Sequence, residues 1–164
     1  EALTFAALAR VSGLSPSTLV QRFDSKVQLV RSTLLHAWDR LEERTAAFAA
    51  SAPKTAEGAI EMLTRLSEAY GGIEAYAEGL LILREDLRDP VLRARGAMWK
   101  ASLCRAIDDC FAEVPRAPQG MGLLMASQWQ GSLLWWGFEP EGSVDRYVEN
   151  NLRRFVAAVL AAGA

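Results

Sequence analysis

The strongest constraint on the fold is a series of closely spaced helix stop and start signals within residues 4–29. A short apolar helix is expected to begin at Thr4 and to run into Gly13, since glycine adopts the left-handed backbone that ends many helices. Ser15 and Pro16 then mark a second helix, with serine as the N-cap and proline at the first helical position. Two short helices joined by a brief turn that contains glycine are typical of a helix-turn-helix unit, which lays its second helix in the major groove of DNA.

A third helix is expected to start at Asp24-Ser25, directly after the second. The residues along the three helices follow one recognisable spacing: Leu8-Ala9, Gly13, Leu14-Ser15, Thr18-Leu19, Phe23, Ser25-Lys26 and Leu29. This spacing resembles the DNA-binding region of the tetracycline-repressor (TetR) family of bacterial regulators. Val20 departs from the family pattern, which usually has at this position a tyrosine that contacts a DNA phosphate. The alternative interpretation of residues 4–29 is three ordinary helices of a bundle.

The resemblance implies an all-helical protein in two parts. Residues 1–35 would form a helix-turn-helix DNA-binding domain, and residues 36–164 would form a helical domain that binds a ligand and dimerises. The family has one more helix before this unit, and we expect that helix to be absent from the sequence. The implied partners are operator DNA, a second copy of the chain and a small hydrophobic effector.

The side chains expected to contact DNA are polar or basic residues at the helix starts and on the second helix. Thr18, Gln21 and Arg22 are long or polar enough to reach base edges or phosphates. Lys26, by analogy with the family, and two serines are expected to bind phosphates, which positions a protein without specifying a base sequence. The full predicted set is Thr4, Ser15, Pro16, Ser17, Thr18, Gln21, Arg22 and Lys26.

The charge of the chain is unevenly distributed. The whole chain has a net charge of −2, which argues against a generally basic nucleic-acid binder. Residues 1–35 carry a net charge of +2 and the remainder −4. A mildly basic head on an acidic body suits a DNA-binding module joined to a domain that does not bind DNA.

The two cysteines argue for a reducing compartment. Cys104 and Cys110 fall on one expected helix, about 9 Å apart along its axis, which exceeds disulfide reach. We therefore expect reduced thiols and a cytoplasmic protein. One histidine and two separated cysteines do not make an ordinary structural zinc site, so no metal is expected.

Apolar residues recur at three- and four-residue steps through the rest of the chain, which predicts helices. The first is a long amphipathic helix over about residues 25–50, which would link the head to the body. Further helices are expected over residues 56–70, 73–87, 90–114, 120–137 and 143–161. Residues 117–138 carry no charge, but their polar side chains and four glycines argue against a membrane span. No strand-like alternation occurs, so we expect an entirely helical fold.

Large apolar residues on the middle helices have two open interpretations. They line a ligand cavity between helices, or they simply pack in the core. The resemblance favours a cavity, because TetR-like proteins bind their effectors among these helices. The residues concerned are Tyr76, Met98, Trp99, Phe111, Met125 and Trp129.

The last two helices carry more apolar surface than one small body can bury. A symmetric four-helix interface between two subunits would cover it, with Gly122 and Gly131 allowing close helix approach. The residues predicted for this interface are Leu124, Trp135, Trp136, Tyr147, Val148, Leu152 and Phe155.

No arrangement of acid, base, nucleophile or metal ligands suggests an enzyme or a cofactor. Glu85, Asp86 and Asp89 alternate with two arginines, which favours a solvated, charge-paired surface over acid–base chemistry. The resemblance to the TetR family implies a transcriptional regulator, a repressor released by its effector. The alternative is a helical ligand carrier or interaction module whose head no longer binds DNA.

Overall fold

The computed structural model describes residues 9–10, 13 and 15–162 of the chain, and every regular element in them is helical. The helix content predicted from the sequence is therefore confirmed. The elements are α2 (Pro16–Phe23), α3 (Lys26–Ser51), α4 (Ala56–Ser67), the short 3-10 helix η1 (Glu68–Tyr70), α5 (Ile73–Arg88), α6 (Pro90–Phe111), α7 (Met121–Phe138) and α8 (Val144–Ala162).

Side-chain capping bonds explain where α2, α3, α4 and α6 begin. The Ser25 hydroxyl accepts a hydrogen bond from the Gln28 N–H at 3.2 Å at the start of α3. Asp89 Oδ1 accepts from the Val91 N–H at 2.8 Å at the start of α6. The expected end of α6 near residue 114 is wrong, because the helix ends at Phe111. Pro115 disfavours helical backbone in the residue before it, and a tight turn replaces the last helical turn there.

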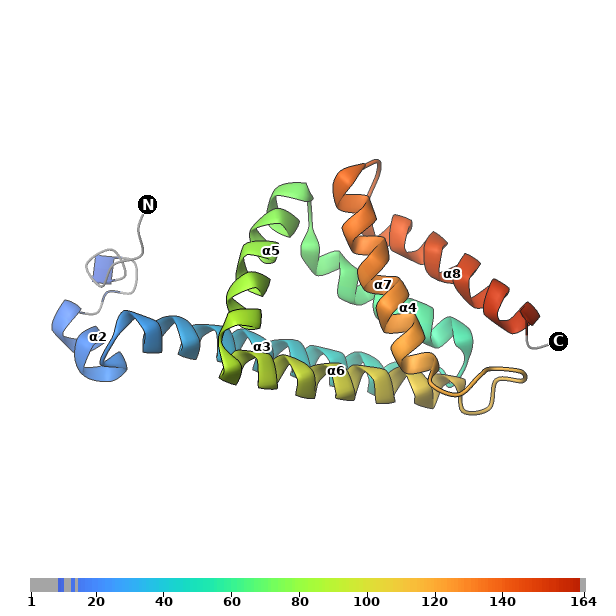
Figure 1. The fold of residues 1–164 in the computed structure, drawn as a ribbon, viewed down its shortest axis with the longest axis horizontal. Helices are drawn as coiled ribbons and strands as arrows, with labels where there is room; N and C mark the ends of the chain where they lie inside the picture. Colours follow the sequence, from blue (N-terminus) through green and yellow to red (C-terminus); the bar gives the residue numbers. More distant parts are fainter. Residues whose placement is uncertain (1–8, 11–12, 14, 163–164) are drawn as a thin grey trace.

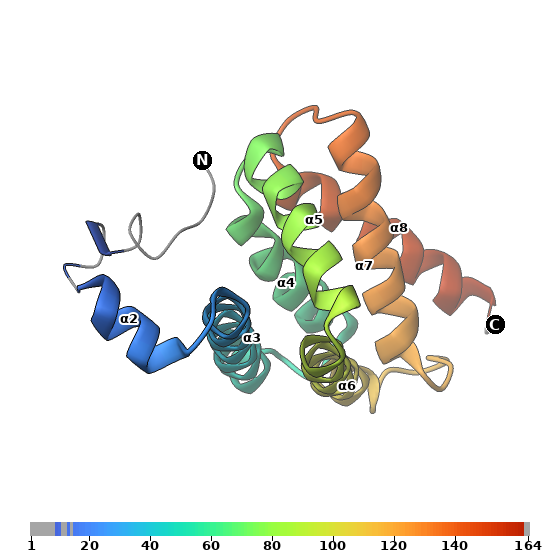
Figure 2. The same ribbon diagram turned by 60° about the vertical axis from the view of Figure 1, so that its left-hand side comes forward.

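Two long helices, α3 and α6, lie side by side along the base of the molecule (Figure 1). α4, α5 and α7 pack against this base, and α8 packs against α4 and α7 on the side away from it (Figure 2). Arg95 of α6 joins the two base helices, because its guanidinium lies 3.1 Å from Asp39 Oδ1 and 3.2 Å from Glu42 Oε2 of α3. α2 projects from the N-terminal end of α3, at the opposite end of the molecule from α8 (Figure 1).

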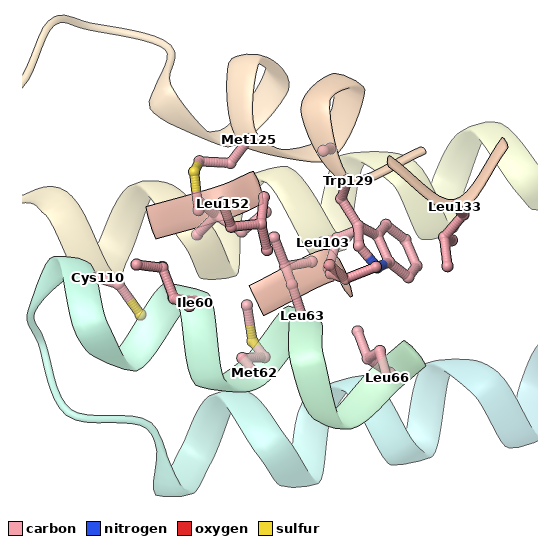
Figure 3. Packing of buried hydrophobic residues seen from close by; sticks show 14 of the residues in the cluster. Ile60, Met62, Leu63, Leu66, Leu103, Cys110, Met125, Trp129, Leu133 and Leu152 are labelled. Carbon is pink, nitrogen blue, oxygen red and sulfur yellow. The ribbon is translucent and has the colours of Figure 1, made fainter. Parts of the chain in front are cut away.

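The hydrophobic core lies between α4, α6, α7 and α8 (Figure 3). Leu63, Ile107, Met125 and Leu152 are fully buried there. The indole N–H of Trp129 donates a hydrogen bond of 2.8 Å to the Ser67 hydroxyl, so this large side chain is buried with its polar edge satisfied. The core therefore joins α4, α6, α7 and α8, and α2 lies outside it.

Both cysteines are free thiols, as the sequence predicts. Cys110 is buried and Cys104 is half-buried. Burial raises the pKa of each thiol, so both remain protonated at neutral pH.

Gly122 permits a close crossing of α7 over α6 within one chain. A Cβ at this position would lie 2.1 Å from the carbonyl oxygen of Cys104, which is a backbone atom and cannot move aside. The Gly122 N–H also donates to Asp108 Oδ1 at 2.7 Å. Gly122 was expected to allow close helix approach at a dimer interface, but it allows a close helix crossing inside the subunit. A Cβ added at Gly131, in contrast, would meet no atom within 4 Å.

Gly122→Ala is expected to lower the free energy of unfolding by about 3 kcal/mol, because the added methyl group forces the two helices apart. Gly79→Ala is the matched control, since it is also a helical glycine and a Cβ there meets nothing within 4 Å. The control should raise the free energy of unfolding by about 0.5–1 kcal/mol through better helix propensity. Urea unfolding measures both, and equal effects would contradict the crossing described.

Candidate functional site

The turn before α2 has the geometry expected from its sequence. Gly13 has a φ of +69°, in the left-handed region, and its N–H donates to the Ala9 carbonyl at 3.0 Å. The Ser15 hydroxyl accepts a hydrogen bond from the Thr18 N–H at 3.1 Å and caps α2. Pro16 is the first residue of the helix. Thr4, also predicted to contact DNA, lies outside the described residues.

One face of α2 is buried and the other is exposed. Leu19 is 4% exposed and Leu29 of α3 is 8% exposed, which anchors α2 on the start of α3. Six of the residues that the sequence predicts to bind DNA are exposed on α2, at its N-cap or at the start of α3: Ser15, Ser17, Thr18, Gln21, Arg22 and Lys26. Neither Arg22 nor Lys26 forms an ion pair with another described residue. The Ser15 hydroxyl, in contrast, is engaged by its cap and by the hydroxyls of Ser17 and Thr18, each at 2.8 Å.

A second candidate site is a cavity of about 420 Å³ between α3, α5, α6 and α7. Its wall is mostly aliphatic and aromatic, with one carboxylate and one amide. The lining residues are Leu34, Ala37, Trp38, Leu41, Tyr70, Tyr76, Gly79, Leu80, Ile82, Leu83, Asp86, Trp99 and Gln130. Four of these residues belong to α3, and the first residue of α3 is Lys26, which follows α2 closely in the chain.

Aromatic side chains of the cavity wall form two pairs. The Trp38 and Trp99 ring centroids are 5.6 Å apart, and those of Tyr70 and Tyr76 are also 5.6 Å apart with the rings edge to face. The Trp99 indole N–H donates to the Thr45 hydroxyl at 3.0 Å. Burial, with a smaller contribution from Tyr76, raises the pKa of Tyr70 to about 12, so this phenol stays neutral.

Asp86 is the one acidic group on the cavity wall, and its position corrects the solvated surface expected from the sequence. It is only 6% exposed, and Oδ1 accepts a hydrogen bond from the Trp38 indole N–H at 3.2 Å. Among the described residues it has no ion-pair partner. Burial raises the pKa of this carboxyl, and the Trp38 hydrogen bond offsets only part of that rise.

Asp89, three residues further along, has the opposite environment. Its Oδ2 lies 2.8 Å from Nε of Arg31 on α3, and its Oδ1 caps α6. The hydrogen bond from Arg31 is the main reason that the pKa of this carboxyl falls below its ordinary value. Glu85 fits the expected solvated surface better, since it is exposed and pairs with exposed Arg84.

The structure separates the residues predicted to bind a ligand. Tyr76 and Trp99 line the cavity. Phe111, Met125 and Trp129 lie in the packed core, and Met98 is 65% exposed on α6. Helical periodicity indicates which side of a helix faces the interior, but it does not indicate whether the space there is filled.

The residues predicted for a dimer interface also divide into two groups. Trp136, Val148 and Leu152 are buried inside the subunit, whereas Tyr147 and Phe155 are partly buried. Leu124 and Trp135 are exposed on α7, at 43% and 65%. Leu134 and Phe138 extend the same exposed apolar stripe.

Other site types find no support in the part of the chain that the structure describes. No three His, Cys, Asp or Glu side chains there lie together as metal ligands would. No described helix combines the length and the apolar character that crossing a bilayer requires.

Asp86→Asn is expected to raise the free energy of unfolding at neutral pH. The pKa of Asp86 is higher in the folded state than in the unfolded state, so ionisation of Asp86 destabilises the fold. The stability gained by Asp86→Asn should therefore be absent below the unfolded pKa and should grow as pH rises through the folded pKa. Asp89→Asn is the matched control with the opposite sign. The pKa of Asp89 is lowered in the folded state, so ionised Asp89 stabilises the fold. The stability lost in Asp89→Asn should therefore be greatest at neutral pH and should become smaller in acid. Urea unfolding between about pH 3 and pH 7 compares the two, and parallel curves would contradict the environments described.

Comparison with known proteins supports the fold. No protein-family model matches the sequence, and no protein of curated function matches it. Among solved structures, the chain is similar to the crystal structure of a protein from Mesorhizobium loti MAFF303099 that is proposed to be a TetR-family transcriptional regulator. The two share 22% sequence identity with a TM-score of 0.64, over 95% of this chain and 86% of the other. The chain therefore has the all-helical fold of that protein.

Proposed function

We propose that this protein is a TetR-like transcriptional repressor that acts in the cytoplasm and places α2 in the major groove of operator DNA. The observation that carries the proposal is the exposed polar face of α2, which lies at the far end of α3 from the body core (Figure 1). Basic Arg22 and Lys26 at this surface have no acidic partner among the described residues. The sequence motif and the fold similarity support the same reading.

Dimerisation would place two such heads on successive turns of the duplex. The exposed stripe on α7, formed by Leu124, Leu134, Trp135 and Phe138, is the surface proposed for this contact. Gly131 lies on the same helix with no neighbouring atom within 4 Å of its missing Cβ, so a partner helix can approach closely there. Large apolar residues of this kind are typical anchors at subunit interfaces.

The cavity is the proposed effector site. An effector bound there would contact Leu34, Trp38 and Leu41 on α3, the helix that begins beside the head. A ligand that binds more tightly to the conformation with one tilt of α3 shifts the spacing of the two heads. A ligand with equal affinity for both conformations changes nothing. This differential contact is how we expect the effector to release the operator.

Lys26→Ala is expected to weaken binding to upstream operator DNA and to random DNA alike, because it removes a phosphate contact without changing base recognition. The slope of log affinity against log salt should fall by about one unit. Lys54→Ala is the control: it removes the same charge from an exposed position between α3 and α4, beyond the C-terminal end of α3. Fluorescence anisotropy at several salt concentrations measures both variants, and unchanged binding by Lys26→Ala would remove Lys26 from the interface.

Trp135→Glu is expected to convert a dimer into monomers, because it buries a charge in the proposed contact. Met98→Glu is matched in chemistry and in exposure, since both side chains are 65% exposed, but it lies on α6 away from the stripe. Sedimentation of the unmodified protein and Met98→Glu should show dimers. A single 18.0 kDa species for the unmodified protein would contradict the dimer.

The helical carrier or interaction module remains the competing function, and the same DNA titration separates it. A carrier would bind ligands in the cavity and show no salt-dependent binding to DNA.

A further inference from the structure

A carboxylate without a cationic partner lies in the wall of an otherwise apolar cavity. Asp86 is 6% exposed, and the hydrogen bond from the Trp38 indole is the one polar contact made to its side chain within the described residues. Three arginines of α3, α5 and α6 bind other carboxylates: Arg31 binds Asp89, Arg84 binds Glu85, and Arg95 binds Asp39 and Glu42. Asp86 therefore keeps capacity to accept hydrogen bonds or to pair with a positive charge.

The cost of burying this group calls for an explanation. A buried carboxylate is normally paired with a cation or bound by several donors, because it loses its hydration on folding. One neutral indole donor at 3.2 Å compensates only part of that loss. A buried titratable group in a cavity is a recognised mark of a binding site, since a ligand can supply the missing charge.

The other walls of the cavity match an organic cation as well. Trp38, Tyr70, Tyr76 and Trp99 all line it, and aromatic rings attract ammonium groups through their electron-rich faces. Cages of such rings recognise quaternary ammonium ligands in other proteins. Tyr70, with a pKa of about 12, adds no negative charge of its own, so Asp86 supplies the negative charge among the residues that line the cavity.

We propose that the cavity binds a lipophilic monocation, an ammonium group carried on an aromatic or bulky apolar body, with its charge at Asp86 and its body among the four aromatic side chains. The cavity of about 420 Å³ accommodates a small molecule of that kind. The proposal assigns a chemical class to the effector and rests on the proposed function for its regulatory meaning.

Asp86 also has a simpler possible role, which is to hold the Trp38 ring in place. In that case the carboxylate would orient an aromatic wall and would not distinguish charged from neutral ligands. Asp86→Asn separates the two roles, because the amide oxygen still accepts from the Trp38 N–H while the negative charge is removed.

The test uses two probes that differ in one atom. Naphthylmethyltrimethylammonium carries a quaternary nitrogen, and neopentylnaphthalene has carbon at the same place and no charge. Equilibrium dialysis against the full chain, with naphthalene fluorescence reporting the free probe, gives both dissociation constants. The unmodified protein should bind the cation more tightly than its neutral counterpart by about tenfold or more.

Asp86→Asn should remove this preference by weakening the cation about tenfold while leaving the neutral probe unchanged. Glu85→Gln is the matched control, because it removes the same charge from the adjacent residue, which is exposed and is not part of the cavity wall. It should retain the preference. Equal binding of the two probes by the unmodified protein would overturn the proposal without any variant. An unchanged preference in Asp86→Asn, or the same loss in Glu85→Gln, would overturn it as well.

The DNA titration distinguishes failure of this inference from failure of the proposed function. Dialysis is done without DNA, so cation selectivity is measured whether or not the chain binds an operator. Selective cation binding with no DNA binding would leave the site assignment standing and refute the repressor. DNA binding with no cation preference would refute the site assignment alone.

Discussion

The packing of Trp38 is the contact on which the arrangement of head, cavity and body depends. Its ring lies against Gly96 of α6, where a Cβ would approach Cζ2 of the indole to 3.1 Å. The same ring pairs with Trp99, and its N–H reaches Asp86 of α5. A single α3 side chain thus contacts two body helices and the cavity at once. The position of this ring therefore sets the orientation of α3 together with the ion pairs that Arg95 forms with Asp39 and Glu42.

Helix boundaries could be predicted from the sequence because capping is local chemistry. Ser15, Ser25 and Asp89 each satisfy backbone N–H groups within the first turn of their own helix, so no distant residue is needed to place them. The left-handed turn at Gly13 is local in the same sense. The cavity, in contrast, is formed by residues that lie far apart in the sequence. Tyr76 lines it while Trp129, an equally apolar residue, is packed in the core, and the difference depends on how four helices meet.

Asp86 shows what sequence reasoning overlooked and which signal was present. Its charged neighbours in sequence suggested a solvated surface, and Glu85 does lie on one. Yet Tyr76, Leu83 and Asp86 follow one another at helical spacing on a single side of α5, so a projection of the helix would have placed a carboxylate on its apolar stripe. The exposure of Met98 had a similar signal, because Met98 lies about 100° around α6 from Trp99 and outside the stripe that buries Leu92, Trp99 and Leu103.

The junction between α5 and α6 consists of one residue. Asp89 ends the first helix, with its N–H bonded to the Glu85 carbonyl at 3.0 Å, and caps the second with its carboxylate. A connection of this length contains no loop that could absorb a displacement. Because Asp89 also forms the ion pair with Arg31 near the start of α3, three helices meet at this one residue. If the proposed effector tilts one of these helices, the three would be expected to move together about Asp89.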